Sequence, residues 1–241
     1  MRGIILSGGS GTRLRPLTKI TSKQLLPIYH RPMIYYPLNT LIKAGIKEIL
    51  IIVAPERAGD YLNLLGSGKE FGVKFTYEIQ DHPEGLAQAF LIGAKFGDND
   101  DVTLILGDNI FEDDFSEAIK NFKGGAKIFA KKVPDPERFG VVKFDDQMKA
   151  EKIIEKPQEF LSNYAVTGLY VYDRQVVQAT KEIKPSGRGE LEITDVNNWY
   201  LAKNELEVAV VDGEWLDAGT FDSLLRAQNF AKDKLADKMI I

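Results

Sequence analysis

The sequence contains no cysteine, and it has only two histidines among its 241 residues. The absence of cysteine excludes disulfides, thiolate zinc sites, iron–sulfur clusters and cysteine nucleophiles. The two histidines, His30 and His82, are too few for a multi-histidine metal site, and a Ser-His-Asp triad would have to use one of them. We interpret both as surface or loop histidines.

Long hydrophobic runs are also absent. The apolar segment after Met1 is interrupted by Gly8, Gly9 and Gly11, so it is too short for the core of a signal peptide, and no other run approaches a membrane span. The chain has 31 Lys+Arg against 35 Asp+Glu, a formal net charge of −4. This balance excludes a general attraction to nucleic acid or to an anionic membrane, although a local basic patch can still bind a small anion. We therefore expect a cytoplasmic protein with neither kind of partner.

The hydrophobic pattern predicts an α/β protein. Hydrophobic residues make up 44% of the chain and charged residues 27%, which is typical of a globular domain. In the first half, strands that are apolar on both faces alternate with helices. This favours right-handed βαβ crossovers and a mostly parallel, Rossmann-like sheet flanked by helices. The predicted strands there span residues 2–7, 48–53, 73–79 and 102–106, and the predicted helices span 33–44, 61–65 and 86–96.

The second half has a more mixed pattern. Here we expect a strand at 126–133, a hairpin of strands 141–144 and 153–155, a strand at 164–172, and helices at 115–122, 190–202 and 221–234. No linker, internal repeat or low-complexity tract divides the chain. The simplest interpretation is one domain over residues 1–241, in which a mixed sheet carries inserted β-hairpins.

A glycine-rich loop follows the first predicted strand. Gly8-Gly9-Ser10-Gly11-Thr12-Arg13 would let backbone amides approach phosphate oxygens closely. The Walker pattern fails because Thr12-Arg13 replaces Lys-Ser/Thr, and the dinucleotide pattern fails because position 14 is Leu. An ordinary strand-to-helix turn is the alternative. Three glycines with Thr and Arg favour phosphate binding, with Arg13 as the cation of the loop.

Other candidates carry weaker signals when each is taken alone. Lys23 follows the loop closely enough to add a second positive charge, but its spacing fits a surface lysine better. Asp108, directly after a buried strand, is placed to hold Mg²⁺ beside phosphates or simply to form a turn. Asp217 would be a second carboxylate for the metal or a helix cap. Glu155 and Lys156 stand at the mouth of a strand, or on an exposed charged edge.

The ordered set of motifs is much more specific than any one of them. Residues 8–13 with 23–27 resemble the signature loop of the sugar-1-phosphate nucleotidyltransferases. Further segments of that family follow in the same order, at residues 107–111, 135–142, 155–157, 162–170, 188–195 and 215–220. The similarity covers essentially the whole chain. It points most closely to the branch of the family that joins dTTP to glucose 1-phosphate, and it implies a homo-oligomer.

The resemblance also implies roles for the matching positions. The triphosphate would be held by Gly8, Gly11, Thr12 and Arg13 with help from Lys23, the thymine by Gln80 and Gly85, and Mg²⁺ by Asp108 and Asp217. The inserted hairpins would form the sugar side, and the sugar-phosphate pocket would be lined by Gly140, Glu155, Lys156, Val166 and Tyr170, with Arg188 near the phosphates. Arg13, Lys23 and Lys156 would be the catalytic cations. A uridylyltransferase and a non-catalytic nucleotide-sugar binding protein are the alternatives.

Longer members of the family carry a further helical segment at the C-terminus, whereas this sequence ends at Ile241. The resemblance therefore leads us to expect that a dTDP-sugar such as dTDP-rhamnose inhibits, if at all, by competing with dTTP at the active site.

Overall fold

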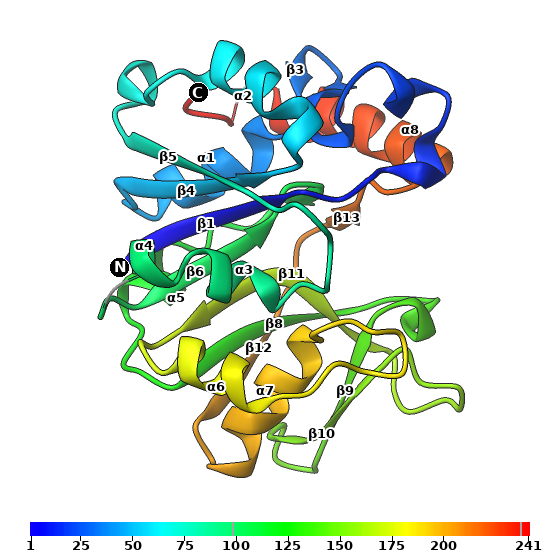
Figure 1. Cartoon of the computed structure of the whole chain (residues 1–241). Coiled ribbons are helices and arrows are strands. Elements are labelled where there is room, and N and C mark those ends of the chain that lie inside the picture. The colour runs from blue at the N-terminus through cyan, green and yellow to red at the C-terminus, as the bar shows by residue number, and fades with distance from the viewer. Residues whose placement is uncertain (98, 237) are drawn as a thin grey trace.

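The first half of the chain forms a parallel sheet in the computed structural model, which describes residues 1–97, 99–236 and 238–241 (Figure 1). Strand β1 (Arg2–Ser7) lies between β4 (Glu48–Val53) and β6 (Val102–Leu106), and β5 (Lys74–Ile79) extends the sheet beyond β4. All three pairings are parallel. The predicted strands and their parallel arrangement are therefore confirmed.

The second half continues the same sheet with antiparallel strands. Strand β11 (Tyr164–Tyr172) runs antiparallel to β6, and its two edges also pair with β8 (Ala126–Lys132) and β9 (Gly140–Phe144). Strand β10 (Ala150–Glu155) completes the predicted hairpin with β9. Strand β12 (Leu206–Val210) pairs in parallel with β8. The result is a mixed sheet in which β11 joins the two halves.

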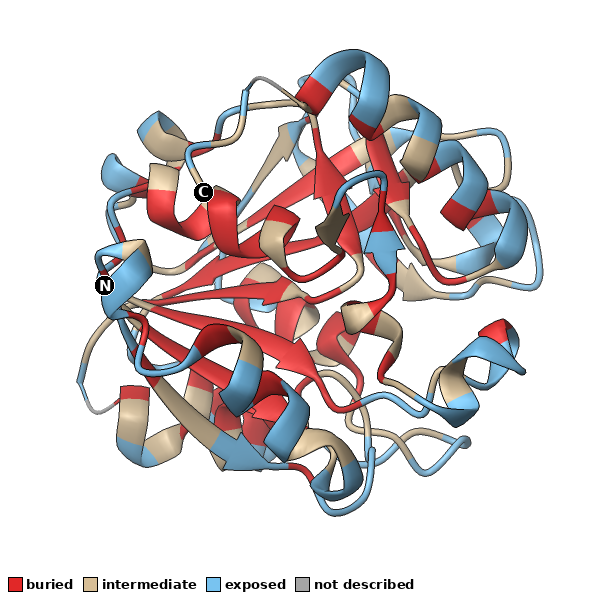
Figure 2. Ribbon diagram, turned by 90° about the horizontal axis from the view of Figure 1, so that it is seen from above, coloured by how far each residue is buried: buried red, intermediate tan, exposed pale blue. Residues whose placement is uncertain are grey.

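Helices cover both faces of this sheet, as the alternation along β1 illustrates. Ile5 packs in the layer that contains α1 (Tyr35–Lys43), α2 (Ala58–Leu65) and α5 (Ser116–Lys120). Its neighbour Ile4 packs in the opposite layer, against α3 (Gln88–Ile92), and α6 (Val176–Glu182) and α7 (Ile193–Ala202) belong to that layer too. In Figure 2 the buried strands fan out between the two layers of helices. Both faces of the strands are therefore apolar because both are covered.

In addition to the two layers, a further apolar cluster lies outside the sheet and holds a two-stranded ribbon in place. Strands β7 (Asn109–Phe111) and β13 (Trp215–Asp217) pair antiparallel, and helix α8 (Phe221–Phe230) packs near them. Ile110 and Leu216 of the ribbon belong to one buried cluster with Leu224 of α8. A short hairpin of β2 (Pro27–Ile28) and β3 (Arg31–Pro32) adds Ile28 to it. This packing holds the ribbon at the end of β6.

Several elements differ from the sequence-based expectation. The helix predicted at 86–96 is divided at Gly93 into α3 and α4 (Ala94–Gly97), because glycine is a poor helix former. The helix predicted at 190–202 begins only at Ile193, since residues 186–192 form a hydrogen-bonded loop. The helix predicted at 221–234 changes at Ala231 into a π-helical turn, Ala231–Leu235. Among the described residues, no helix is both long and apolar enough to cross a membrane.

Candidate active site

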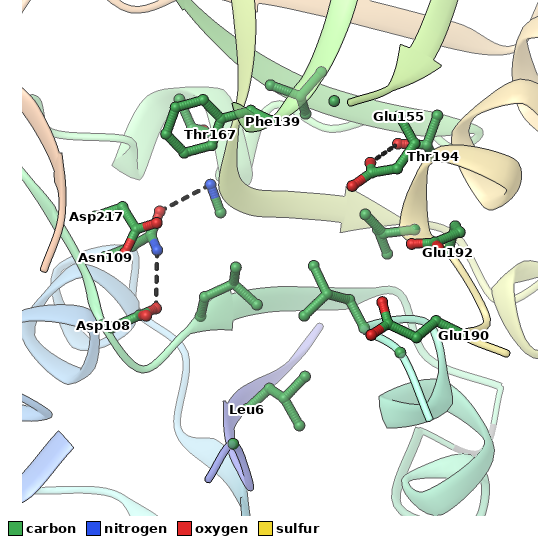
Figure 3. Close-up of a pocket in the computed structure, with 18 of the residues that line it drawn as sticks. Leu6, Asp108, Asn109, Phe139, Glu155, Thr167, Glu190, Glu192, Thr194 and Asp217 are labelled. Carbon is green, nitrogen blue, oxygen red and sulfur yellow. Dashed lines mark hydrogen bonds between the residues drawn. The ribbon is translucent and has the colours of Figure 1, made fainter. Parts of the chain in front are cut away.

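One cavity of about 600 Å³ lies where the two halves of the chain meet. Twelve of the positions singled out from the sequence line it: Arg13, Lys23, Gln80, Gly85, Asp108, Gly140, Glu155, Lys156, Val166, Tyr170, Arg188 and Asp217. Figure 3 shows two separate groups of carboxylates, with Asp108 and Asp217 at one end and Glu155, Glu190 and Glu192 at the other. The elements thus gather residues from distant parts of the chain into one site.

The glycine-rich loop reaches the cavity through Gly9 and Arg13, whereas Gly8, Gly11 and Thr12 are not among its lining residues. Gly8 packs so closely against the amide oxygen of Gln80 that a side chain at this position would overlap it. The carbonyl of Gly11 accepts a hydrogen bond from the Thr18 hydroxyl at 2.8 Å. Gly8 and Gly11, both expected to hold phosphate, therefore contact Gln80 and Thr18 in this structure and do not line the cavity.

Lys23 and Asp108 form a buried ion pair at the carboxyl end of β6. The Lys23 ammonium donates to Oδ2 of Asp108, and each side chain is only 12–13% exposed. Burial by itself would raise the pKa of Asp108, but the positive charge and hydrogen bond of Lys23, with a further bond from Asn109, lower it below the ordinary value. Asp108 is therefore an ionised carboxylate, and Lys23 is no surface lysine.

Asp217 reaches the same place from the other end of the chain. In the β7–β13 ribbon it lies opposite Asn109, the residue after Asp108. Burial, and then the negative charge of Asp108, raise the pKa of Asp217 to about 6. Its Oδ1 atom is buried and has no hydrogen-bond partner among the described residues. A bound cation would offset the repulsion between the two carboxylates and would give this oxygen a partner.

The donor set fits a hard divalent cation that also binds substrate oxygens. Mg²⁺ is commonly held by one or two carboxylates, with phosphates and waters completing its shell. Asp108 and the orphaned Oδ1 of Asp217 supply such a pair of carboxylates. In the part of the chain that the structure describes, no group of three or more His, Cys, Asp or Glu side chains forms a closed metal cage. The site therefore suits a metal that arrives with phosphate ligands.

Asn109 is a functional candidate that the sequence did not single out by itself. Its Nδ2 donates to Oδ1 of Asp108 at 3.1 Å. Its own Oδ1 accepts from the Gly168 amide at 2.9 Å and from the Trp215 indole at 2.6 Å. Those two donors fix which way the Asn109 amide points, so its NH₂ group must face Asp108. The only sequence signal was its place inside the Gly107-Asp108-Asn109 turn.

At the other end of the cavity, Glu155 is held in position by a hydroxyl and two cations. The Thr194 hydroxyl donates to its Oε2 at 2.7 Å, while Lys156 and Arg188 lie 3.7 and 3.3 Å from its Oε1. Lys156 has a left-handed backbone with φ of 42°, a conformation that is strained for a residue other than glycine. Lys156 is also half exposed. The ammonium is therefore free to turn toward a ligand.

Arg188 lies among carboxylates instead of standing free for phosphate. Its Nη2 lies 2.8 and 2.9 Å from the two carboxylate oxygens of the buried Glu192 and 3.4 Å from Glu190. The hydrogen bonds that the guanidinium donates to Glu192 raise its pKa further. A third arginine, Arg138, lines the cavity and was not named as a candidate; it pairs with Asp135 at 2.6 Å.

The remaining candidates divide between the cavity and the surface. Gln80 is buried and donates through Nε2 to Oε1 of Gln88 at 2.6 Å. Val166 and Tyr170 are buried on β11, as expected for a pocket wall, and burial raises the pKa of Tyr170 well above its ordinary value. His30 and His82 are both exposed and line no part of the cavity, which confirms their interpretation as surface residues.

Taken with the fold, these features define a class. A glycine-rich loop, paired buried carboxylates and several cations lie at the carboxyl ends of parallel strands, which is the arrangement of an α/β enzyme that handles phosphate groups. The comparison with known families agrees. Residues 2–234 match the family described as nucleotidyl transferase, and the chain belongs to that family.

Several relatives show how close the similarity is. The chain is 51% identical over 238 residues to a glucose-1-phosphate thymidylyltransferase of Neisseria meningitidis, covering 96% of this chain and 83% of that one. It is 52% identical over 237 residues to one from Mycolicibacterium smegmatis, covering 96% and 82%.

Solved structures give the same picture. A crystal structure of a candidate glucose-1-phosphate thymidylyltransferase from Bacillus anthracis in complex with sucrose has a TM-score of 0.92 and 51% identity, covering 97% and 96% of the two chains. A UDP-glucose pyrophosphorylase complexed with UDP-glucose has a TM-score of 0.85 at 23% identity over 97% and 98% of the chains, and it shows the shared fold.

Proposed function

We propose that this nucleotidyltransferase transfers a thymidylyl group from dTTP to glucose 1-phosphate, which yields dTDP-glucose and pyrophosphate. The observation that carries the proposal is the buried triad of Asp108, Lys23 and Asp217 at one end of a cavity whose other end presents Glu155 and Lys156. The cavity would thus have separate places for a triphosphate and for a sugar phosphate. About half of the residues match those of proteins named for this reaction.

The chemistry requires alignment and charge neutralisation more than proton transfer. A phosphate oxygen of glucose 1-phosphate forms a bond to the α-phosphorus of dTTP, and the bond from that phosphorus to the bridging oxygen of pyrophosphate breaks. The attacking oxygen is already anionic, so no general base is needed. Arg13 and Lys23 would neutralise the triphosphate, and the loop at Gly8, Gly11 and Thr12 would close around it.

On the sugar side, each proposed role follows from the chemistry of the group. Lys156, a mobile point charge, would bind the phosphate of glucose 1-phosphate. Glu155 would accept hydrogen bonds from sugar hydroxyls, with Gly140, Val166 and Tyr170 shaping the wall around the ring. Arg188 would hold Glu155 and Glu192 in place unless a phosphate displaces one of them.

Members of this family generally use a divalent metal, and we propose Mg²⁺ held by Asp108 and Asp217. When bound, the ion would neutralise charge on the phosphates and the leaving group. The orphaned Oδ1 of Asp217 is the feature that supports this assignment.

Three proposals concern the whole protein. Residues 1–241 would form a single nucleotidyltransferase domain, a homo-oligomer would be its working form, and the cytoplasm would be its location, because dTTP is an intracellular metabolite. Light scattering at several protein concentrations tests the oligomer directly.

The reaction is tested by measuring pyrophosphate release over a grid of nucleotides and sugar 1-phosphates with Mg²⁺. We expect dTTP with glucose 1-phosphate to be the best pair. UTP lacks one methyl group, apart from its 2′-hydroxyl, and should be about 10–200-fold less efficient. A preference for UTP would make the protein a uridylyltransferase. Equal efficiency with ATP or GTP would refute the base assignment, and no release with any pair would indicate a non-catalytic binding protein.

A further inference from the structure

The orientation of the Gln80 amide matters because its two ends are chemically opposite. A glutamine amide presents an accepting oxygen at one end and a donating NH₂ group at the other, so a rotation of 180° exchanges them. Gln80 lines the cavity and is only 3% exposed. Its Oε1 lies against Gly8 and accepts no hydrogen bond from any residue that the structure describes. The side chain therefore has an acceptor available for a ligand.

Two groups of Glu84 fix the orientation of the neighbouring amide of Gln88. The backbone N–H of Glu84 can only donate, and it lies 3.1 Å from Oε1 of Gln88. The Glu84 carboxylate can only accept, and its Oε2 lies 2.8 Å from Nε2 of Gln88. Reversing the Gln88 amide would set donor against donor and acceptor against acceptor. The oxygen of Gln88 must therefore stay on the side of the Glu84 amide.

The same oxygen of Gln88 then fixes Gln80. Oε1 of Gln88 also lies 2.6 Å from the terminal group of Gln80, so that group must be the donating Nε2. This leaves Oε1 and one remaining N–H of Gln80 for a ligand. The chain of hydrogen bonds runs from a backbone amide, which cannot be reversed, through Gln88 to the residue proposed to contact the base.

We propose that Gln88 is a positioning residue that makes the enzyme reject cytosine nucleotides by holding the Gln80 amide in one orientation. This inference rests on the proposed function, because it assigns Gln80 to the base of the nucleotide. Thymine and uracil present an N3–H donor beside carbonyl acceptors. Cytosine presents an N3 acceptor beside an amino donor, so both of its groups oppose an amide set for thymine. A free amide could rotate to suit either base; a fixed amide suits one.

The test compares dTTP with dCTP, which differ at this edge of the ring. The substitution Gln88→Met keeps the length of the side chain but removes the group that holds Gln80. We measure kcat/KM for each nucleotide with glucose 1-phosphate and take the dTTP-to-dCTP ratio. A site with matched hydrogen bonds discriminates by about 10⁴-fold or more, and we expect the ratio to fall by at least about tenfold in the variant. Efficiency with dTTP should fall while efficiency with dCTP rises.

A matched control comes from helix α6. Gln178 donates through Nε2 to Oε1 of Glu182 at 2.8 Å, which is also a Gln–Glu pair spaced four residues apart, and neither residue lines the cavity. Gln178→Met should leave the ratio unchanged. If Gln88→Met fails to fold, Glu84→Ala on the exposed preceding loop removes the acceptor of the Gln88 Nε2 and should lower the ratio by a smaller factor.

An unchanged ratio in Gln88→Met overturns the proposal, even if both efficiencies decrease together, because an equal loss indicates only a structural role. Calorimetric Kd values for dTTP and dCTP, measured without sugar phosphate, give the same ratio independently of turnover. A wild-type protein that forms no dTDP-glucose would refute the proposed function, whereas equal binding ratios in wild type and variant would refute this inference alone.

Discussion

Asp108 and Asp217 show how two neighbouring carboxylates acquire different properties from their surroundings. Asp108 lies beside the Lys23 ammonium and keeps its charge, whereas Asp217 lies next to the charge of Asp108 and resists losing its proton. The raised pKa of Asp217 means that its ionisation near neutral pH is unfavourable for the folded protein without a cation. The pair of carboxylates is therefore costly for the native state unless a cation lies beside it.

The substitution Asp217→Asn should separate these two effects. We expect turnover to fall by about 10²-fold or more, because an amide is a poorer ligand for a hard cation. Without metal, the variant should be at least as stable as wild type at pH 7.5. Since folding raises the pKa of Asp217 from 3.8 to about 6, the wild type should gain stability relative to the variant as the pH falls from above 6 toward 4.

The measurements are metal-free unfolding curves at several pH values and activity at limiting Mg²⁺. Near-full activity at limiting Mg²⁺ would show that Asp217 is not a ligand. A variant that is less stable at pH 7.5 would contradict the electrostatic explanation of its pKa.

Lys156 combines a strained backbone with a proposed catalytic charge. Its φ of 42° costs about 1–3 kcal/mol for a residue with a side chain, a cost that glycine avoids. We expect Lys156→Gly to leave stability unchanged or to increase it by about 1 kcal/mol, despite glycine's greater chain entropy, while KM for glucose 1-phosphate rises strongly. Lys156→Ala should cause the same kinetic defect without the gain in stability. An unchanged KM in both variants would refute its role in binding the sugar phosphate.

At the scale of elements, the segment from Gly8 to Leu26 contains only three short 3₁₀ turns, so its position depends on contacts with other parts of the chain. Arg57, in a short 3₁₀ turn after β4, donates to the carbonyls of Lys19 and Ile20 at 2.8 and 3.1 Å. Both cations proposed for the triphosphate, Arg13 and Lys23, belong to this segment. Arg57 therefore holds the middle of this segment in place through two hydrogen bonds to its backbone.

We predict that Arg57→Ala raises KM for dTTP by about tenfold, because two hydrogen bonds worth about 0.5–1.5 kcal/mol each are lost. The kcat and the KM for glucose 1-phosphate should change little. Asp60→Ala is the matched control, since Asp60 pairs with Arg57 only at 3.9 Å and leaves the carbonyl contacts in place. Equal effects of the two substitutions on KM for dTTP would contradict this explanation.

The sequence predicted long elements better than short ones, because only the long ones carry a clear pattern of their own. Strands such as β4 and β11 are long apolar runs, so burial alone reveals them. Strands β7 and β13 have only three residues each, and each forms a strand only because it pairs with the other. Helix α6 was not predicted, and four of its seven residues are polar or charged. Short elements depend on tertiary pairing, which periodicity does not record.

The residues of the candidate site also differ in whether local sequence or tertiary contacts reveal them. The glycine loop, Asp108 and Lys156 could be identified because their motifs are contiguous in the sequence. Asn109 could not, because its hydrogen bond to Trp215 joins residues 106 positions apart, and Gln88 could not, because the residue pattern does not reveal its side-chain hydrogen bond to Gln80. The sequence therefore indicated the residues proposed to touch substrate better than those that orient them.

At the scale of the whole molecule, backbone hydrogen bonds join the loop around Gly85 to the loop that precedes helix α7. The Leu191 amide donates to the Glu84 carbonyl at 2.7 Å, and the Ala87 amide donates to the Leu191 carbonyl at 3.1 Å. Gly85 lies between them with φ of 104°, and a methyl group on it would overlap the backbone of Leu191. The two loops can approach this closely only because position 85 is glycine.

Gly85→Ala should therefore separate the loops, raise KM for both substrates and destabilise the protein by about 2 kcal/mol or more. Gly45→Ala is a suitable comparison because Gly45 has a similar φ of 83° but open space around it. It should cost only the backbone strain and leave both KM values unchanged. If Gly45→Ala destabilises the protein as much as Gly85→Ala does, and Gly85→Ala leaves both KM values unchanged, the contact with Leu191 affects neither stability nor substrate binding.

The β7–β13 ribbon also joins two parts of the candidate site that are synthesised at different times. Trp215 bonds to Asn109 across 106 residues of sequence. A ribosome adds about 5–20 residues per second, so roughly 5–20 s separate the synthesis of these two partners. Strands β1, β4, β5 and β6 can pair during that interval, but the second carboxylate has not yet been made. A nascent chain would thus contain the glycine-rich loop and Asp108 early, and it would complete the pair of carboxylates only after Asp217 has been made.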